Sequence, residues 1–534
     1  MRKFSHSSIV VILMLFVLRA SAAVLYVDVN TTNPVPPYSD LTSAAVTIQD
    51  AADIATNGDL ILVNDGVYED GFRTTQELVT TSSPPYPQTC SVTNRLVVTN
   101  ALNIQSINGP SAAFISGGGM YRCVYLSNRA VLSGFTLMNG VAGWIYTTQS
   151  LRGNIVTKTN AFNGGGVACP TVWGSSPVWV SNCVLTANMA YGNGGGADGV
   201  NLRNCTLTGN TATSGGGACD STLSHCIVTG NSANATGPIY NMYPGTYHSI
   251  GILPASGGGI YGGSALNCIV ANNTAFAGGG VYGASKLVNC TIVKNSAAFY
   301  GGMGSDNPGL YTSSSLTNCL VYFNAAGTNA NYGTTNFSMD HCCTFPLPSS
   351  GVGNFTNDPT LLDVYGGDFH LQSNSPCCNS GINAGIANST DLDGNPRIVG
   401  GTVDIGAYEF QSPKSVLSYA WDQKYGLPTD GSADFMDSDG DGMNNWQEFL
   451  AGTNPTNAAS VLKITTVYPI RTSLWAVVKW QSVSSRSYFL QRCSSLSSGF
   501  MTIQSNLAGA DGTTIYFDTT ATNATSFFYR VGVQ

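Results

Sequence analysis

The segment with the clearest chemical signature is DSDGDGMNNWQE, residues 437–448. Carboxylates alternate along its first half, a glycine follows them, and a glutamate closes the segment. In this spacing, carboxylates at positions 1, 3 and 5, a backbone carbonyl at position 7 and a bidentate glutamate at position 12 surround one Ca2+. We therefore expect Ca2+ as a cofactor, held by Asp437, Asp439, Asp441, Met443 and Glu448. The alternative is a solvated acidic linker.

The residues around this segment indicate which kind of calcium loop it is. NNWQEFLAG can form a helix on its C-terminal side, whereas no clear helix precedes it. The segment therefore resembles a dockerin or thrombospondin type 3 calcium loop more than a complete EF-hand. That resemblance implies an ion that stiffens a linker, here residues 411–459, and takes no part in catalysis.

A second group of residues could act as acids and bases. Between residues 150 and 345 charged residues are few, and glutamate is absent. A lyase acting on an acidic glycan needs a base and a cationic group, and most glycosidases need two carboxylates. Asp198 and Asp220 lie about one repeat apart, so they would stack about 5 Å apart on one face, with Arg203 nearby. These three are the catalytic candidates; the alternative is that the aspartates are solvated turn residues.

Aromatic residues in two insertions are candidates for ligand binding. IYNMYPGTYHSIG, residues 239–251, interrupts the repeat with Tyr240, Tyr243 and Tyr247, and Trp144 lies in another insertion. Aromatic faces on loops can stack on sugar rings. The alternative is that these rings pack back onto the repeat.

A repeat must position all of these candidates. SNCVLTANMA, RNCTLTGNTA and SHCIVTGNSA are followed by three more copies, each with an asparagine five residues after its cysteine. The cysteines follow one another at 22, 21, 42, 22 and 29 residues; they are Cys183, Cys205, Cys226, Cys268, Cys290 and Cys319. We interpret the step of 42 as two periods and the last step as one period plus a loop. A fixed period of about 20–50 residues indicates a repeat architecture.

Short β-prone segments and glycine turns in a unit of about 21 residues predict one coil of a right-handed parallel β-helix. The cysteines would then point into a dry bore. The asparagines would occupy corners in left-handed backbone and bond to the next coil, and glycine triplets such as 194–196 would allow turns where a Cβ would clash. We expect an all-β chain with the β-helix over residues 23–410, then the calcium-loop linker and a small C-terminal β-sandwich.

Two stretches of the β-helix resemble known families. The pattern N-x-A-x-x-G-G-G, over roughly residues 160–305, resembles the repeats of chlamydial polymorphic outer membrane proteins, with cysteine near the position of that family's phenylalanine. This resemblance implies a β-helical surface protein. TIQDAADIATNGDLILVNDGVYED is similar to the first segment of pectate-lyase-like β-helices, and its amphipathic residues 47–56 predict a helix that covers the first coil.

The end of the repeat resembles another exported family. DFHLQSNSPCCNSG and DLDGNPRIVGGTVDIGAYEF resemble the choice-of-anchor Q domain, which implies an anchored bacterial β-helix protein whose residues 368–410 close the last coil. Arg397 with Asp404 or Glu409 could be taken for an active site; we favour a buried ion pair. Residues 460–534 alternate short apolar segments with turns and resemble a fibronectin type III sandwich, a module that binds, spaces or displays.

The N-terminus and the cysteines bear on the compartment. Arg2 and Lys3, the apolar run 9–18 and Ala20-Ser21-Ala22 predict a signal peptide over residues 1–22, and no later stretch predicts a transmembrane helix. We therefore expect a secreted or bacterial cell-surface protein. Of the 15 cysteines, six form the repeat column, and the pairs Cys342-Cys343 and Cys377-Cys378 are better disulfide candidates.

Two classes of function remain open. The first is a non-enzymatic structural or binding protein whose partner is an extracellular polysaccharide or a cell-surface component, with adhesin-like or glycan-binding activity. The second is a polysaccharide-active enzyme, most plausibly a lyase of the pectate-lyase-like class. The scarcity of charged residues, 9% of the chain, favours the first class, and the net charge of −8 argues against nucleic acid as a partner.

Overall fold

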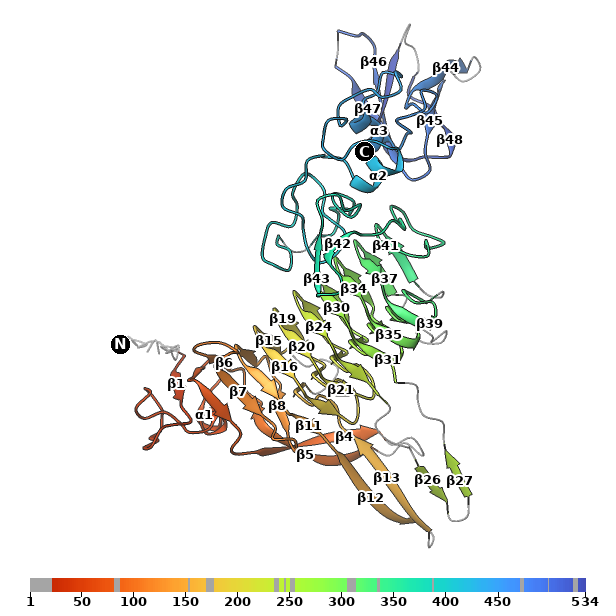
Figure 1. The fold of residues 1–534 in the computed structure, drawn as a ribbon. Helices are drawn as coiled ribbons and strands as arrows, with labels where there is room; N and C mark the ends of the chain where they lie inside the picture. Colours follow the sequence, from red (N-terminus) through yellow and green to blue (C-terminus); the bar gives the residue numbers. More distant parts are fainter. Residues whose placement is uncertain are drawn as a thin grey trace, which may run out of the picture.

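The computed structural model describes residues 22–80, 87–151, 154–169, 177–234, 240–243, 246–249, 255–304, 314–333, 337–386, 389–470, 475–497, 499–521 and 527–534. The predicted signal peptide lies outside these residues, apart from Ala22. Figure 1 shows stacked coils that lead to a small β module near the C-terminus. The chain is a right-handed parallel β-helix followed by this module.

The longest ladder of the β-helix is the β1–β40 sheet, which is parallel throughout. Its inward residues, such as Leu132, Val180 and Leu202, are fully buried in one continuous core. Its strands, in spatial order, are β1 (Val24–Val27), β2 (Leu60–Val63), β6 (Asn103–Ser106), β9 (Val131–Ser133), β15 (Trp179–Ser181), β19 (Asn201–Arg203), β23 (Thr222–Ser224), β29 (Ser264–Leu266), β33 (Lys286–Val288), β37 (Ser314–Thr317) and β40 (Phe337–Asp340).

Two further ladders continue each coil. The β3–β41 sheet consists of β3 (Gly66–Tyr68), β7 (Ala113–Ser116), β10 (Thr136–Met138), β16 (Val184–Thr186), β20 (Thr206–Thr208), β24 (Ile227–Thr229), β30 (Ile269–Ala271), β34 (Thr291–Val293), β38 (Leu320–Tyr322) and β41 (Cys343–Thr344). The β11–β39 sheet consists of β11 (Val141–Ala142), β17 (Met189–Ala190), β21 (Thr211–Ala212), β25 (Ser232–Ala233), β31 (Thr274–Ala277), β35 (Ser296–Phe299) and β39 (Ala325–Thr328).

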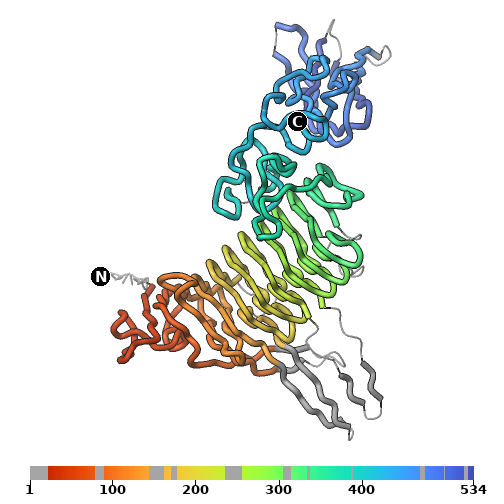
Figure 2. Tube along the Cα trace, in the orientation of Figure 1, coloured from red at the N-terminus to blue at the C-terminus, as the bar shows by residue number. Residues whose placement is uncertain are grey.

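The fourth ladder, the β4–β36 sheet, completes the coil, and the tube in Figure 2 traces the successive turns. Its first pair, β4 with β5, is antiparallel, and the other pairs are parallel. Its strands are β4 (Arg73–Thr80), β5 (Pro87–Val98), β8 (Arg122–Leu126), β14 (Val167–Ala168), β18 (Ala197–Asp198), β22 (Ala218–Cys219), β28 (Ile260–Tyr261), β32 (Val281–Tyr282) and β36 (Met303–Gly304).

The helix predicted to cover the first coil is present as α1 (Ile48–Ile54), which begins after the N-cap Thr47. The Thr47 hydroxyl accepts a hydrogen bond from the Asp50 backbone amide, which satisfies one of the unpaired donors at the helix start. Ile48 and Ala51 are buried in the same core as the β-helix bore. The helix therefore covers apolar surface at the first coil, as the sequence predicts.

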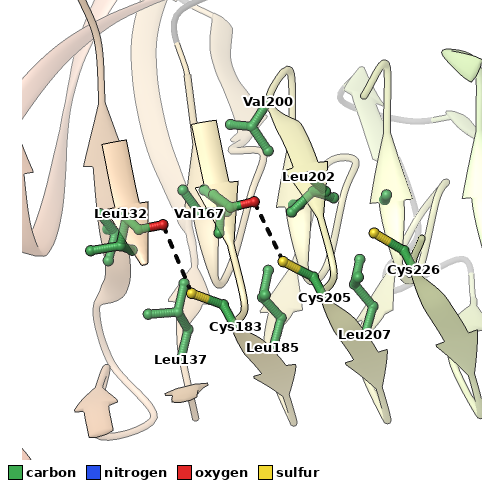
Figure 3. Close-up of a cluster of buried hydrophobic side chains, with 14 of the residues drawn as sticks. Leu132, Leu137, Val167, Cys183, Leu185, Val200, Leu202, Cys205, Leu207 and Cys226 are labelled. Atoms are coloured by element: carbon green, nitrogen blue, oxygen red, sulfur yellow. Dashed lines mark hydrogen bonds between the residues drawn. The ribbon is translucent and has the colours of Figure 1, made fainter. Parts of the chain in front are cut away.

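The cysteine column lies in the bore, as predicted. Figure 3 shows Cys183, Cys205 and Cys226 among leucines and valines of neighbouring coils, and the cysteines of the column are at most 2% exposed. Each thiol donates to the carbonyl two residues earlier, at 3.3 Å from Cys205 Sγ to the Arg203 oxygen. A small apolar side chain with one weak donor suits this position, since the bore offers few other polar partners.

The asparagine ladder forms, but its backbone differs from our expectation. Asn210 Nδ2 donates to Asn231 Oδ1 at 2.9 Å and to the Leu185 carbonyl at 2.9 Å, and this pattern repeats along the axis. The left-handed residue is the one before each ladder asparagine, for example Ala187 with φ 53° and Lys294 with φ 55°. The asparagine itself can then turn inward and satisfy backbone groups on either side.

The glycine triplets behave as predicted. Gly194 has φ +67°, and a Cβ there would lie 2.3 Å from the Ala197 carbonyl oxygen. A Cβ on Gly195 would lie 2.5 Å from the Gly216 carbonyl oxygen of the next coil. Any larger residue would push neighbouring coils apart at this corner.

One step of the repeat was wrongly interpreted. β24 pairs directly with β30, so the 42 residues from Cys226 to Cys268 form one enlarged coil and not two. The additional length holds the antiparallel hairpin of β26 (Tyr240–Tyr243) and β27 (Thr246–Ser249). A second hairpin, of β12 (Trp144–Leu151) and β13 (Asn154–Ala161), enlarges an earlier coil. An insertion as long as one coil has the same effect on spacing as an added coil.

The coils end earlier than expected, at β40 and β41. Residues 368–410, which begin with β43 (Asp368–Leu371), add no coil. Together with β42 (Leu361–Asp363), they lie against the outer face of the β3–β41 sheet. The Ala407 amide donates to Thr291 Oγ1 at 2.9 Å, and Ile405 packs beside Leu320. Apolar residues on the outside of these late strands, such as Val293, thereby become buried.

The adjacent cysteine pairs form no disulfide: Cys342, Cys343, Cys377 and Cys378 are free thiols. Cys342 belongs to the bore, whereas Cys343 belongs to the cluster on the outer face of the sheet. Consecutive residues of extended backbone point to opposite faces, so the sulfurs of Cys342 and Cys343 are directed apart.

The C-terminal module is a sandwich of two antiparallel sheets. Its core includes Val478, Trp480, Tyr488 and Leu490, which come from both sheets. One sheet has the order β44 (Ile464–Ile470), β45 (Trp475–Ser482), β48 (Gly512–Asp518), and the other has the order β47 (Met501–Ala508), β46 (Ser487–Cys493), β49 (Phe528–Val533). Two short helices, α2 (Tyr419–Lys424) and α3 (Asn445–Ala451), lie before it in the sequence. Among the described residues, no helix is long and apolar enough to cross a membrane.

Candidate functional site

The acidic loop folds around its own carboxylates. One oxygen atom from each of Asp437, Asp439 and Asp441 lies within 4.8 Å of the other two. Asp437 Oδ1 accepts the Gly440 amide at 2.8 Å, and its Oδ2 accepts the Gly442 amide at 3.0 Å. These hydrogen bonds curl the backbone so that like charges converge. Convergence of like charges costs free energy unless a cation lies between them.

Glu448 completes the acidic group from the first turn of α3. This helix begins at Asn444, whose side chain accepts the Gln447 amide at 2.9 Å while Gln447 Oε1 accepts the Asn444 amide at 2.9 Å. Glu448 is fully buried, and burial, followed by the charges of Asp439, Asp441 and Asp437, raises its pKa to about 7.

The unpaired oxygen atoms of the acidic loop are compatible with a calcium ion. Among the described residues, three buried carboxylate oxygens here have no hydrogen-bond partner: Asp439 Oδ2, Asp441 Oδ2 and Glu448 Oε2. A buried anionic oxygen without a partner is costly, and oxygen ligands from carboxylates are those that Ca2+ prefers. Ca2+ would supply positive charge and cross-links between loop and helix. Asp437, Asp439, Asp441, Glu448 and the Met443 carbonyl would hold it.

The acidic loop and α3 are connected to the segments on both sides. Arg486, in the sandwich, donates from Nε to the Leu450 carbonyl at 2.9 Å and from Nη2 to the Phe449 carbonyl at 3.1 Å. The Phe449 ring packs edge-to-face on Trp421 of α2, with centroids 5.5 Å apart. The position of α3 therefore bears on both the sandwich and the segment that packs on the β-helix.

The three catalytic candidates are not assembled as expected. Asp198 is in register with Cys219 and not with Asp220, because the coil that begins at Asp198 has 21 residues. Asp220 follows at an exposed turn with φ 45°. Arg203 is exposed on β19, in a different sheet, in register with Ser181 and Ser224. The expected face-to-face pair of aspartates with a nearby arginine is therefore wrong.

Asp198 instead belongs to a buried polar network that the spacing did not indicate. Asn163 Nδ2 donates to Asp198 Oδ2 at 3.3 Å, and the Asn163 carbonyl accepts from Arg122 Nη2 at 2.7 Å. Arg122 is fully buried and forms an ion pair with Glu77. Burial, then the charge of Asp220, raises the pKa of Asp198 to about 7 against the hydrogen bonds from Asn163 and Cys219.

This network could be found only after the coils were placed. Its members come from an antiparallel strand, β4, and from three different coils, so no fixed spacing links Glu77, Arg122, Asn163 and Asp198. The signal that remained in the sequence was Arg122, the one charged residue of β8, and Glu77, the one acidic residue of β4. Buried charges are usually paired, so such residues predict a partner without naming it.

The four aromatic ligand candidates are placed by backbone alone. Trp144 is in β12, Tyr240 and Tyr243 are in β26, and Tyr247 is in β27, so all four belong to the two inserted hairpins. Their side chains lie outside the part of the chain that the structure describes. Their role as glycan contacts stays a prediction.

Arg397 is buried but makes no direct ion pair with Asp404 or Glu409. Its Nη2 donates to the carbonyls of Asp404 at 3.0 Å and Gly406 at 2.6 Å. The two carboxylates accept backbone amides instead, including that of Asp404 to Glu409 Oε2 at 2.9 Å. Burial raises the pKa of Glu409 to about 9 and that of Asp404 to about 7. This cluster ties the 391–410 segment together, away from any coil end.

Comparisons with known proteins find only two weak structural likenesses. No family model matches this chain, and no curated protein matches it. A crystal structure of pectate lyase Pel9A is similar with a TM-score of 0.39 and 10% identity, over 73% of this chain and 97% of that chain. A crystal structure of a pectin methylesterase mutant in complex with a hexasaccharide gives a TM-score of 0.24 and 12% identity, over 60% of this chain and 81% of that chain. The resemblances to polymorphic outer membrane protein repeats and to choice-of-anchor Q stay predictions.

Proposed function

We propose that this chain is an exported structural and binding protein, in which a rigid β-helix carries a C-terminal sandwich through a calcium-stabilised junction. The observation that carries the proposal is the acidic loop, whose buried oxygens lack partners and whose exit helix contacts both neighbouring segments. A bound ion would fix α3, and through Phe449 and Arg486 would limit movement of the sandwich. The partner in this proposal is an extracellular polysaccharide or a cell-surface component.

Limited proteolysis tests the calcium-stabilised junction. The full chain is treated with protease in Ca2+ and in EDTA, and cleavage within residues 411–459 is followed by mass spectrometry. We expect protection by Ca2+ that is weakened in Asp439→Asn. Asp430→Asn is the matched control, because Asp430 is an exposed aspartate of the same linker whose contacts are with Ser432. Equal cleavage rates with and without Ca2+ would refute the junction.

A polysaccharide-active enzyme is the second candidate, favoured by one observation. Asp198 is 4% exposed on an outward position of the β4–β36 sheet, with a pKa raised to about 7 by burial. A carboxyl that is protonated near neutral pH can act as a general acid. Incubation with pectin, alginate and related glycans in Ca2+, followed by absorbance of unsaturated products, separates the candidates. Cleavage abolished by Asp198→Asn would favour the enzyme; glycan-array binding without cleavage would favour the binding protein.

A further inference from the structure

A second pair of buried carboxylates lies between the β-helix and the calcium loop. Asp422, in α2, is 1% exposed, and Asp434 is 3% exposed. Neither belongs to the DSDGDG segment, and the sequence pattern of the loop does not include them. Two carboxylates buried side by side repel each other unless a proton or a cation compensates them.

The Asp422 side chain has no partner of its own. Both of its carboxylate oxygens are buried and accept no hydrogen bond. Among the described residues, the same is true of three carboxylate oxygens in the acidic loop: Asp439 Oδ2, Asp441 Oδ2 and Glu448 Oε2. Its backbone is well held, since its amide donates to the Ser418 carbonyl at 2.9 Å and its carbonyl accepts the Leu427 amide at 2.8 Å. The carboxylate is therefore held in place while its charge is left uncompensated.

Several other oxygen atoms surround the same place. Ser415 Oγ donates to Asp434 Oδ1 at 2.8 Å, and Ser415 and Asp434 are the two groups that act on the pKa of Asp422 besides its burial. A Cβ built on Gly431 would lie 2.5 Å from the Lys414 carbonyl oxygen and 3.7 Å from Asp434 Oδ2. Because Gly431 has no side chain, nothing from this residue fills the space beside the Lys414 carbonyl oxygen and Asp434 Oδ2. The result is a group of oxygen atoms from carboxylates, a hydroxyl and a backbone carbonyl.

We propose that Asp422 and Asp434, with the Lys414 carbonyl and the Ser415 hydroxyl, form a second Ca2+ site that clamps α2 to the 430–436 segment. Ca2+ takes six to eight oxygen ligands in flexible geometry, and water can complete the set. This site shares its cation with the proposed junction but depends on different side chains. It would couple the packing of α2 on the β-helix to the acidic loop that begins at Asp437.

The stoichiometry of Ca2+ binding tests this site. Metal-free full chain is titrated with CaCl2 by isothermal calorimetry, and the bound ions are counted by native mass spectrometry. We expect two ions for the unmodified chain, one for Asp422→Asn, one for Asp439→Asn and none for the double variant. Asn is close in size to Asp, and circular dichroism of each metal-free variant verifies folding.

Each outcome decides between the two sites. One ion in the unmodified chain that is lost in Asp439→Asn would overturn the second site, and Asp422 would then be a protonated acid beside Asp434. One ion that is lost in Asp422→Asn but kept in Asp439→Asn would support the second site and refute the acidic loop. If Asp422→Asn does not fold, the Asp439→Asn count alone decides: one ion supports the second site, and none overturns it.

Discussion

Asn210 and Asn231 lie one coil apart in the β-helix, and the Asn210 backbone amide and Nδ2 both donate to Asn231 Oδ1, at 3.0 Å and 2.9 Å. Asn231 in turn donates to the Leu207 carbonyl and to Asn273 Oδ1. One amide thus satisfies backbone groups of two coils and passes the same pattern to the next. The ladder explains why the repeat keeps an asparagine at this position.

Removal of one ladder amide should destabilise the β-helix. Asn231→Ala removes the side-chain acceptor of the buried Asn210 amide and one donor to the Leu207 carbonyl, and a buried group left without a partner costs about 1–3 kcal/mol. We expect the free energy of unfolding in urea to fall by about 2–5 kcal/mol. Asn234→Ala, at an exposed position three residues later, should have little effect. Equal free energies of unfolding for the two variants would contradict a stabilising role of the asparagine ladder.

The thiols of the bore should be unreactive in the folded chain. Cys205 and Cys226 are at most 2% exposed, and burial raises the pKa of the Cys205 thiol above its ordinary value. Because the thiolate is the reactive form, alkylation needs both exposure and ionisation. Peptide mapping after iodoacetamide treatment should find Cys205 and Cys226 labelled only in urea. Labelling of either residue in the native chain, or a disulfide between them, would contradict a closed bore.

The burial of Asp198 in the β4–β36 sheet should make the stability of the chain depend on pH. The pKa of Asp198 is raised to about 7 in the folded chain, whereas an unfolded aspartate has a pKa of about 4. The free energy of unfolding should therefore fall as pH rises from about 4 to 7, and it should stay lower above pH 7. Asp198→Asn should therefore be more stable than the unmodified chain at pH 8 by about 1–4 kcal/mol, and no more stable at pH 4. Urea unfolding at the two pH values measures this. A loss of stability at pH 8 would mean that the carboxylate is compensated by a charge in its site.

His370 should also make stability fall as pH rises, but in a higher pH range than Asp198. Partial burial lowers its pKa, but hydrogen bonds to Asp393 and Asp368 outweigh burial and raise the pKa above its ordinary value. Its stabilising charge is therefore fully present below about pH 6.5 and is lost as pH rises through the folded value. Since the ring is half-buried against Tyr408, we expect at most about 1 kcal/mol. His370→Gln should flatten stability between pH 6 and 9; an unchanged profile would assign the dependence to other groups.

The sequence was sufficient for the features that repeat. Cysteines at one phase, asparagines five residues later and glycine triplets each require the same environment in every coil, so spacing alone predicted the bore, the ladder and the tight corners. The convergence of the three loop aspartates could also be predicted, because all three come from one short segment.

Contacts that depend on the length of a particular coil could not be predicted. A one-residue difference brings Cys219 and not Asp220 beside Asp198, and an insertion equal to one period was taken for a coil. Ile405 and Ala407 cover the β3–β41 sheet, and Ala407 contacts Thr291, more than a hundred positions earlier in the sequence. No repeat spacing indicates this contact. The same holds for Asp422 and Asp434, which approach only through the fold of the linker.

The central claim is that Ca2+ stabilises the junction between the β-helix and the sandwich, and differential scanning calorimetry of the full chain tests it most directly. An ion that binds only the folded state at 100 times its dissociation constant adds about 2.7 kcal/mol, which is enough to separate the Ca2+ and EDTA transitions clearly. We predict a higher transition temperature in Ca2+ for the unmodified chain and for Asp430→Asn, and a clearly smaller difference for Asp441→Asn. Identical transitions of the unmodified chain in Ca2+ and in EDTA would contradict the claim.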